Sequence, residues 1–188
     1  MRWEQLFADL EAQAAAEEAR AEQAESGSRA RAAYGRLRLA DRLRGAVGAE
    51  LTVSCRGAGD QSGRLLAVGV DWLLLQDAGR REVLVGTGAV RAVAGLTTVT
   101  APEPEGVVER RLDLRRALRG LARDRAPVQV LLDDGAVVTG TVDRVGADFV
   151  EVAEHPADRP RRVGAVTGVR AVALDAVAVV RRLAPPVS

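Results

Sequence analysis

The chain has 188 residues, of which 47% are hydrophobic, 28% charged and 3% aromatic, a balance typical of a folded, water-soluble protein rather than a disordered one. Its formal net charge of +1 excludes a strong overall attraction to nucleic acid or to an anionic membrane. All 27 basic residues are arginine, which we interpret as coding bias, so arginine abundance alone does not indicate phosphate binding.

The N-terminal segment predicts an amphipathic helix over residues 2–25. Its apolar stripe repeats at helical spacing and consists of Trp3, Leu6, Phe7 and Leu10. Beyond this stripe the segment is rich in alanine and glutamate, which favours an exposed helix, and Ser26, Gly27 and Ser28 are predicted to end it. The stripe predicts either packing on the rest of the protein or a surface that binds a protein partner.

A second helical pattern is followed by alternating apolar residues. Leu37, Leu39, Leu43 and Val47 predict the helix, and glycines at 45 and 48 mark its end. From Glu50 the apolar period changes to two, and five short strand-like segments follow up to about residue 96. A helix followed by five short strands is typical of a small β-barrel.

The pattern then starts again after a linker. Residues 100–106, TAPEPEG, carry two prolines and no apolar periodicity, and a further helix and strands follow. We therefore predict four parts: an N-terminal helix over 1–28, a helix with a small β-barrel over 29–99, a linker over 100–108, and a helix with a second small β-barrel over 109–188. No run of about 18 apolar residues predicts a membrane span, and we expect a cytoplasmic protein.

The two barrel segments are a repeat with a spacing of 77 residues. Laying residues 50–75 on 127–152 without a gap gives five identities, which are Val53 with Val130, Gly63 with Gly140, Val68 with Val145, Gly69 with Gly146 and Asp71 with Asp148. Most other pairs keep their apolar or polar character, as a duplicated fold predicts.

Two alignments of the end of the repeat remain open. The pentapeptide VRAVA occurs at 90–94 and at 169–173, and matching these copies leaves AVAVVRRL as an additional C-terminal strand. Alternatively, VGTGAVRAV at 85–93 matches VALDAVAVV at 172–180, with a longer insertion in the second copy. We favour the first alignment.

The predicted barrels resemble the Sm-like fold, which belongs to the small SH3-like barrels. The second copy carries the resemblance best, in VQVLLDDGAVVTGTVDRVGADFVEV, with Asp134 and Gly135 at the first hairpin and Gly140 in the second strand. The whole chain is also similar to an uncharacterised actinobacterial protein family with tandem barrels. In Sm-like RNA binders an asparagine closely follows the corresponding aspartate, but none closely follows Asp71 or Asp148 here. The resemblance therefore implies a fold and no RNA-binding residue.

We find no pattern of residues that predicts catalysis, a metal or a cofactor. His155 is the single histidine and is predicted to be a solvated turn residue, while Cys55 is predicted to lie in the core because its counterpart is Leu132. One cysteine and one histidine do not form a tetrahedral metal site. Asp133 and Asp134 form the expected hairpin turn rather than a catalytic pair. We expect a protein that is not an enzyme and that uses no cofactor or metal.

Charge is unevenly distributed along the chain. Residues 1–25 hold seven acids against two arginines, a net charge of −5, whereas residues 29–44 hold six arginines against one acid, a net +5. Residues 109–125 hold seven arginines against three acids, a net +4. The basic blocks indicate one of two surfaces. The first is a set of solvated helix faces that can pair with the acidic helix, and the second is a nucleic-acid surface formed by Arg36, Arg38, Arg42, Arg44, Arg115, Arg116 and Arg119.

The sequence favours a non-enzymatic interaction or scaffold protein that binds protein partners or associates with itself. The competing hypothesis is a regulatory protein that binds RNA or DNA through the arginine-rich helices. Neither hypothesis involves a membrane.

Overall fold

A computed structural model describes residues 3–101, 113–156 and 166–183. The chain divides into two compact units, Met1–Leu39 and Ala40–Ser188. Most of the predicted linker 100–108 and most of the predicted insertion at 154–160 lie outside the described residues.

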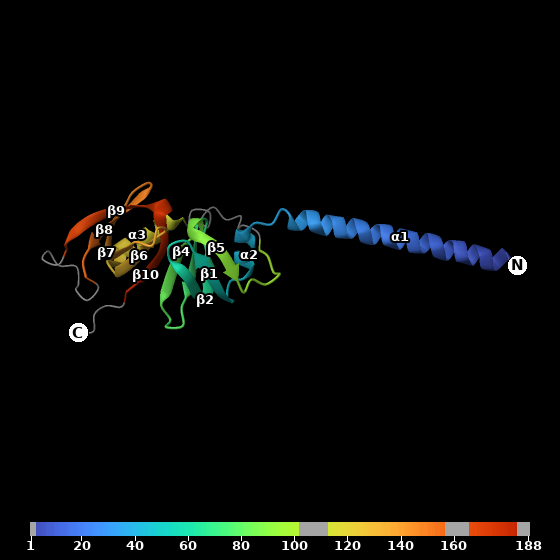
Figure 1. Cartoon of the computed structure of the whole chain (residues 1–188), viewed down its shortest axis with the longest axis horizontal. Coiled ribbons are helices and arrows are strands. Elements are labelled where there is room, and N and C mark those ends of the chain that lie inside the picture. Colours follow the sequence, from blue (N-terminus) through green and yellow to red (C-terminus); the bar gives the residue numbers. More distant parts are fainter. Residues whose placement is uncertain (1–2, 102–112, 157–165, 184–188) are drawn as a thin grey trace. The chain divides into compact units, whose positions relative to one another are not determined.

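The first unit is built on helix α1 (Trp3–Tyr34), a single helix that confirms the N-terminal helix and extends beyond its predicted end (Figure 1). The predicted break at Ser26, Gly27 and Ser28 is wrong. A glycine inside a helix costs only about 1 kcal/mol relative to alanine, and the strong helix formers on both sides offset that cost. The Ser26 hydroxyl also donates to the Gln23 carbonyl oxygen at 3.0 Å, which satisfies it within the helix.

The first half of the second unit contains a short helix and five strands. Helix α2 (Leu39–Gly45) precedes β1 (Glu50–Cys55), β2 (Gly59–Val68), β3 (Trp72–Gln76), β4 (Glu82–Gly86) and β5 (Val90–Ala94), and the short 3-10 helix η1 (Thr87–Ala89) separates the last two strands. The strands follow the order β5-β1-β2-β3-β4 across the sheet.

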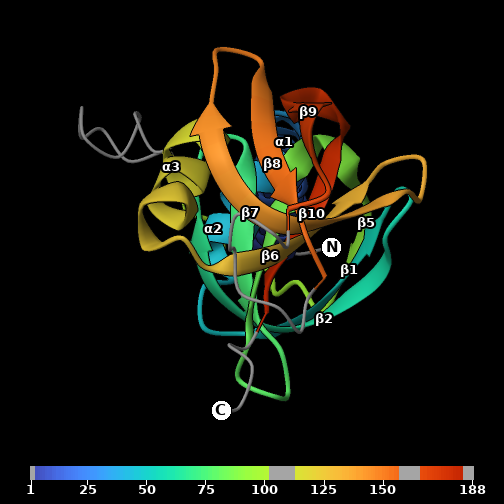
Figure 2. The same ribbon diagram turned by 90° about the vertical axis from the view of Figure 1, so that its left-hand side faces the viewer.

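The second half repeats this arrangement. Helix α3 (Leu114–Asp124) precedes β6 (Pro127–Leu132), β7 (Val137–Val145), β8 (Phe149–Glu154), β9 (Gly168–Ala173) and β10 (Val177–Arg182), with η3 (Leu174–Ala176) between the last two strands. The strand order is β10-β6-β7-β8-β9, and α3 packs against β7 (Figure 2).

The two halves form one antiparallel sheet of ten strands in the described residues, not two closed barrels. The mainly β fold with helices is confirmed, whereas the prediction of separate barrels is wrong. The reason lies in β4 and β10, which pair with each other and join the halves. In both strands, consecutive apolar residues point to opposite faces of the sheet. All of them are buried only if both faces of the strand are covered by other parts of the protein.

Equivalent hydrogen bonds confirm the duplication. The Gly69 N–H donates to the Trp72 carbonyl oxygen at 2.8 Å, and the Gly146 N–H donates to the Phe149 carbonyl oxygen at the same distance. Both second strands also shift register at equivalent points, between Leu65 and Ala67 in β2 and between Val142 and Arg144 in β7. Turns and bulges that recur at equivalent points in the two copies indicate one backbone fold used twice.

The favoured alignment of the repeat's end is wrong. The VRAVA segment at 90–94 is the fifth strand of the first half, whereas VRAVA at 169–173 lies in the fourth strand of the second half. The Thr87 N–H donates to the Asp71 carbonyl oxygen at 2.9 Å, and the Leu174 N–H donates to that of Asp148 at 2.8 Å, so η1 and η3 are equivalent. AVAVVRRL is therefore the fifth strand and not an addition. A pentapeptide of Val, Ala and Arg fits either strand, so its identity alone does not determine the alignment.

Cys55 lies in the core of the first half, as predicted, and its sulfur is 3.6 Å from the Val53 carbonyl oxygen. Burial, followed by the nearby charge of Asp60, raises the pKa of the thiol to about 11. Because the thiolate is the reactive species, the thiol reacts slowly near neutral pH.

We therefore predict that iodoacetamide at pH 8 leaves the folded protein unmodified, whereas the protein in concentrated guanidinium is fully alkylated. Intact-protein mass spectrometry measures both outcomes. Alkylation of the native protein at the rate of a free cysteine peptide would show that the core opens readily at β1.

His155 is buried, with 3% of its surface exposed, so the prediction of a solvated turn residue is wrong. Its Nδ1 lies 3.0 Å from the Pro156 carbonyl oxygen, which only accepts, so this nitrogen carries the proton. Its Nε2 forms a hydrogen bond with the hydroxyl of buried Thr141 at 2.8 Å. The histidine forms a hydrogen bond with a hydroxyl group in the core. Sequence spacing does not reveal this contact, because Thr141 lies in β7 whereas His155 directly follows β8.

We predict that His155→Ala lowers the free energy of unfolding by about 1–3 kcal/mol, because it leaves the buried Thr141 hydroxyl without its partner. Urea denaturation followed by circular dichroism measures the loss. The double variant His155→Leu with Thr141→Val should recover part of the stability, since it removes both polar groups. Equal losses in the two variants would contradict this account.

Candidate interaction surfaces

The junction between β4 and β10 joins the two halves through antiparallel pairing. Val179 lies opposite Val85, Val180 opposite Leu84, and Arg181 opposite Val83. Gly86 ends β4 at a close approach, because a Cβ atom there would lie 2.6 Å from the Val177 carbonyl oxygen. A side chain at this position would push the two strands apart.

The junction strands contribute to both hydrophobic cores. Leu84 belongs to the first half but packs in the core of the second, with Leu114 and Leu118. Conversely, Ala178 and Val179 belong to the second half and pack in the core of the first. Each half thus completes the core of the other.

A further contact links the hairpins of the two halves. Arg56, after β1, forms a salt bridge with Asp133, after β6. The neighbouring Gly57 has a φ of +70°, and a Cβ atom there would collide with the backbone at Leu132 and Asp133. The two hairpins therefore touch backbone to backbone, which requires glycine.

The sheet ends at β5 on one side and β9 on the other, and both strands are largely exposed. By the equivalence of η1 and η3, β9 corresponds to β4 and β5 corresponds to β10. Arg170 on β9 stands where β4 has Val83, and Arg91 on β5 stands where β10 has Ala178. Arg170 Nε donates to Glu154 Oε1 at 2.8 Å, and Arg91 Nη1 lies 3.3 Å from its own strand's Val90 carbonyl oxygen. At these two positions the end strands therefore carry an arginine where the junction strands carry an apolar residue.

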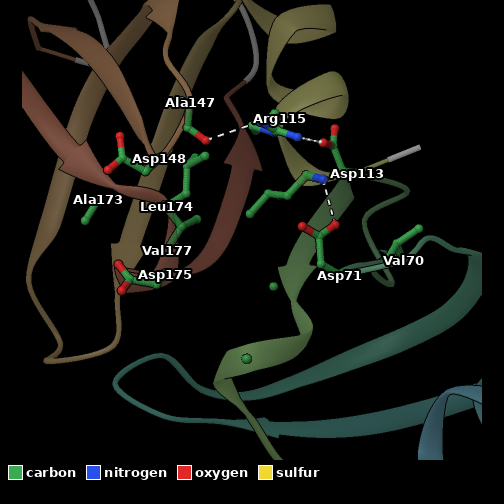
Figure 3. Close-up of a pocket in the computed structure, with 13 residues that line it drawn as sticks. Val70, Asp71, Asp113, Arg115, Ala147, Asp148, Ala173, Leu174, Asp175 and Val177 are labelled. Atoms are coloured by element: carbon green, nitrogen blue, oxygen red, sulfur yellow. Dashed lines mark hydrogen bonds and ion pairs between the residues drawn. The ribbon is translucent and has the colours of Figure 1, made fainter. Parts of the chain in front are cut away.

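A cleft of about 770 Å³ opens beside the junction (Figure 3). Asp71, which follows β2, accepts a hydrogen bond from the Leu114 N–H at 2.7 Å and so caps the first turn of α3 across the junction. The equivalent Asp148 also lines the cleft. Asp71 thus ties the helix of the second half to the first half.

Asp113 is the N-cap residue of α3, and its Oδ1 accepts from the Arg116 N–H at 2.9 Å. Arg115 pairs with the same carboxylate, at 2.6 Å from Nη2 to Oδ2, and its Nη1 lies 3.4 Å from the Ala147 carbonyl oxygen. Partial burial by itself raises the pKa of Asp113, but the hydrogen bond from Arg116, the pairing with Arg115 and the charge of Arg119 outweigh it and lower that pKa. The first turn of α3 is therefore fixed by charge and hydrogen bonds.

A second groove, of about 630 Å³, runs between α3 and β7 and is rich in arginine. We call it the arginine groove, and its lining residues are Asp113, Arg116, Arg119, Ala122, Arg123, Asp143, Arg144 and Val145. Arg116, Arg119 and Arg123 are exposed and come from one face of α3, whereas Arg144 comes from β7. The four arginines outnumber the two aspartates, so the groove attracts anions.

The other predicted nucleic-acid residues lie elsewhere. Arg36 and Arg38 lie in the connection between α1 and α2. Arg42 Nη2 donates to the Thr97 carbonyl oxygen at 2.8 Å, and Arg44 pairs with Asp41 at 2.9 Å. Of the seven predicted arginines, the structure places Arg116 and Arg119 in the arginine groove.

The predicted partner-binding residues Trp3, Leu6, Phe7 and Leu10 all fall within α1, but their side chains lie outside the described part of the structure. Arg123 and Arg144 also line the arginine groove but are not among the arginines predicted from the sequence. Arg119 follows Arg116 by three residues and Arg123 follows Arg119 by four. This helical spacing is a signal that the three arginines share one helix face. Arg144 gave no signal, because only the packing of β7 on α3 brings it to the groove.

Comparison with known proteins finds no protein-family model and no curated protein that matches this chain. Of the helices that the structure describes, none is both long and apolar enough to cross a membrane. Within the described ranges, no group of three or more His, Cys, Asp or Glu residues is placed to hold a metal ion.

Proposed function

We propose that this protein is a non-enzymatic, cytoplasmic interaction or scaffold protein, and that β5 and β9 are edges to which extended segments of protein partners add as further strands. Unpaired strand edges present N–H and C=O groups that such segments can bind. One observation carries the proposal. The two halves of the chain are joined by pairing of strand β4 with strand β10, while the equivalent strands β9 and β5 end the sheet.

Differences between the end strands and the junction strands favour other proteins over unlimited addition of copies of this chain. Ala173 stands where the junction has Gly86. If an incoming strand approached β9 as closely as β10 approaches β4, the methyl group of Ala173 would collide with the backbone of that strand. Arg91 and Arg170 also place charge on the edges, a common protection against uncontrolled pairing. A partner segment that supplies its own complementary side chains avoids both obstacles.

The Sm-like resemblance belongs to the same proposal. Each half has a helix followed by five strands, and we propose that the halves are open, fused relatives of this fold. Small folds of this kind support many functions, so the resemblance itself does not identify a partner.

Lysine substitutions on the edges test the proposal. Ala92→Lys on β5 and Ala171→Lys on β9 place a charge on exposed edge positions, and Val99→Lys is a matched control at an exposed position outside the strands. We expect tagged wild-type and control proteins to retain the same partner from lysate of the producing organism, and at least one edge variant to lose it. Hydrogen exchange should show the partner protecting β5 or β9. Retention by all variants, without such protection, would refute the edge proposal.

The arginine groove supports nucleic-acid binding as the second candidate. Exposed arginines along one helix face can contact successive phosphates, and such binding weakens steeply as salt rises. Fluorescence anisotropy with generic RNA and DNA at low and at high salt tests it, with Arg119→Gln as the variant. The absence of binding at low salt would exclude this candidate.

A further inference from the structure

Helix α1 carries an acidic stripe that matches the arginine groove. We define the stripe as Glu18, Glu22 and Glu25, all exposed. At about 100° per residue, these three positions lie within an arc of about 60° on the helix surface. Arg20 lies on nearly the opposite side, so the face is anionic from Glu18 to Glu25, and Arg29 follows on the same face one turn further.

Arg116, Arg119 and Arg123 form the complementary stripe on α3. They also lie within an arc of about 60°. Their steps along the helix are three and then four residues, whereas those of the acidic stripe are four and then three. At about 1.5 Å per residue, the two sets of steps match when the helices run antiparallel. Glu25 then faces Arg116, Glu22 faces Arg119 and Glu18 faces Arg123.

We propose that α1 of one molecule docks antiparallel on the arginine groove of a second copy, with the acidic stripe paired to the three arginines. The stripes have opposite charge and the same spacing, and Arg144 from β7 lies beside the groove, where its Nε is 3.8 Å from Glu151 Oε2. This inference deepens the proposed interaction role by naming one partner, and it uses surfaces other than the strand edges.

Existing contacts do not prevent this pairing. Glu25 pairs with Arg29 at 3.0 Å, but both side chains are well exposed and can exchange partners. Asp113 in the groove is held by Arg115 and the helix N-terminus, although it also attracts the charge of Arg119. Asp143 also lines the groove and reduces its charge, which makes the association weak and sensitive to salt.

A reciprocal charge exchange in the full chain tests the proposal. One variant carries Glu18→Arg, Glu22→Arg and Glu25→Arg, and the other carries Arg116→Glu, Arg119→Glu and Arg123→Glu. Each variant alone brings like charges together, so we expect each to associate at least tenfold more weakly than the wild type. A mixture of the two restores opposite charges at the contact and should associate again.

Sedimentation velocity over a range of concentrations, at about 20 mM and about 500 mM salt, provides the measurement. The wild type should associate at low salt and be monomeric at high salt. The matched single variants are Glu22→Arg, expected to weaken association about fivefold, and Glu17→Arg, which lies off the stripe and should change it less than twofold. Circular dichroism shows whether each variant is folded.

A wild-type chain that stays monomeric at low salt would overturn the proposal, whether the groove then binds nucleic acid or the acidic helix of its own chain. So would a mixture of folded charge variants that fails to associate. The edge variants Ala92→Lys and Ala171→Lys should associate like the wild type. Failure of strand-edge binding and failure of helix docking are therefore distinguishable.

Discussion

Gly140→Ala should lower the free energy of unfolding by about 3 kcal/mol. A Cβ atom at this position in β7 would overlap the Ala153 carbonyl oxygen and lie 2.8 Å from its carbonyl carbon. The obstacle is the backbone of the paired strand β8, which cannot rotate away as a flexible side chain can. The strands must separate, and the core of the second half loses its close packing.

Urea denaturation measures this effect, and the chain offers a matched control. Gly120 lies inside helix α3, and a Cβ atom there meets nothing within 4 Å. Gly120→Ala should therefore stabilise the protein by about 0.5–1 kcal/mol, because alanine favours the helix. The repeat adds a second test, since Gly63→Ala should act like Gly140→Ala through the Gln76 carbonyl oxygen. A neutral Gly140→Ala variant would show that β7 and β8 are less closely paired than described.

Val179→Asp should destabilise the protein by more than about 4 kcal/mol and remove both cores together. Val179 is completely buried on β10, where it packs in the core of the first half although it belongs to the second. A carboxylate there would be buried without a partner. Its backbone lies opposite Val85, so disruption of this strand also separates the junction.

Thermal unfolding of the wild type and the variant, followed by circular dichroism and by tryptophan fluorescence, tests this prediction. Apart from the melting of α1, the wild type should show one coincident transition with both probes, because the cores are interlocked. Val169→Asp on β9, where 58% of the residue is exposed, is the control and should change stability by less than about 0.5 kcal/mol. Two separate transitions in the wild type would show that the halves fold independently.

Local patterns predicted the elements and the duplication well. Alternation of apolar residues located the strands, and the Asp134 and Gly135 hairpin was recognised from its sequence; Gly135 indeed adopts a φ of +92°. The repeat assigned Cys55 to the core through its counterpart Leu132. These features depend on neighbours within a few residues or on a comparison of the two copies, so the sequence contains them directly.

Contacts across the sheet were not predictable in the same way. The alternating residues of a strand indicate which faces are buried but do not identify the neighbouring strand, so the sequence was consistent with two closed barrels. His155 looked like a solvated turn residue because its partner Thr141 lies 14 positions away. Arg144 joined the arginine groove only through the packing of β7 against α3.

The repeat is visible in the amino-acid sequence alone, because matched alternation, matched turns and required glycines are local consequences of one backbone used twice. The sequence alone also shows the opposite charges of the N-terminal helix and the helix before β6. That the two copies share one sheet became evident only from the three-dimensional fold. The shared sheet depends on β4 and β10, whose apolar residues on both faces are buried only when each strand completes the core of the other half.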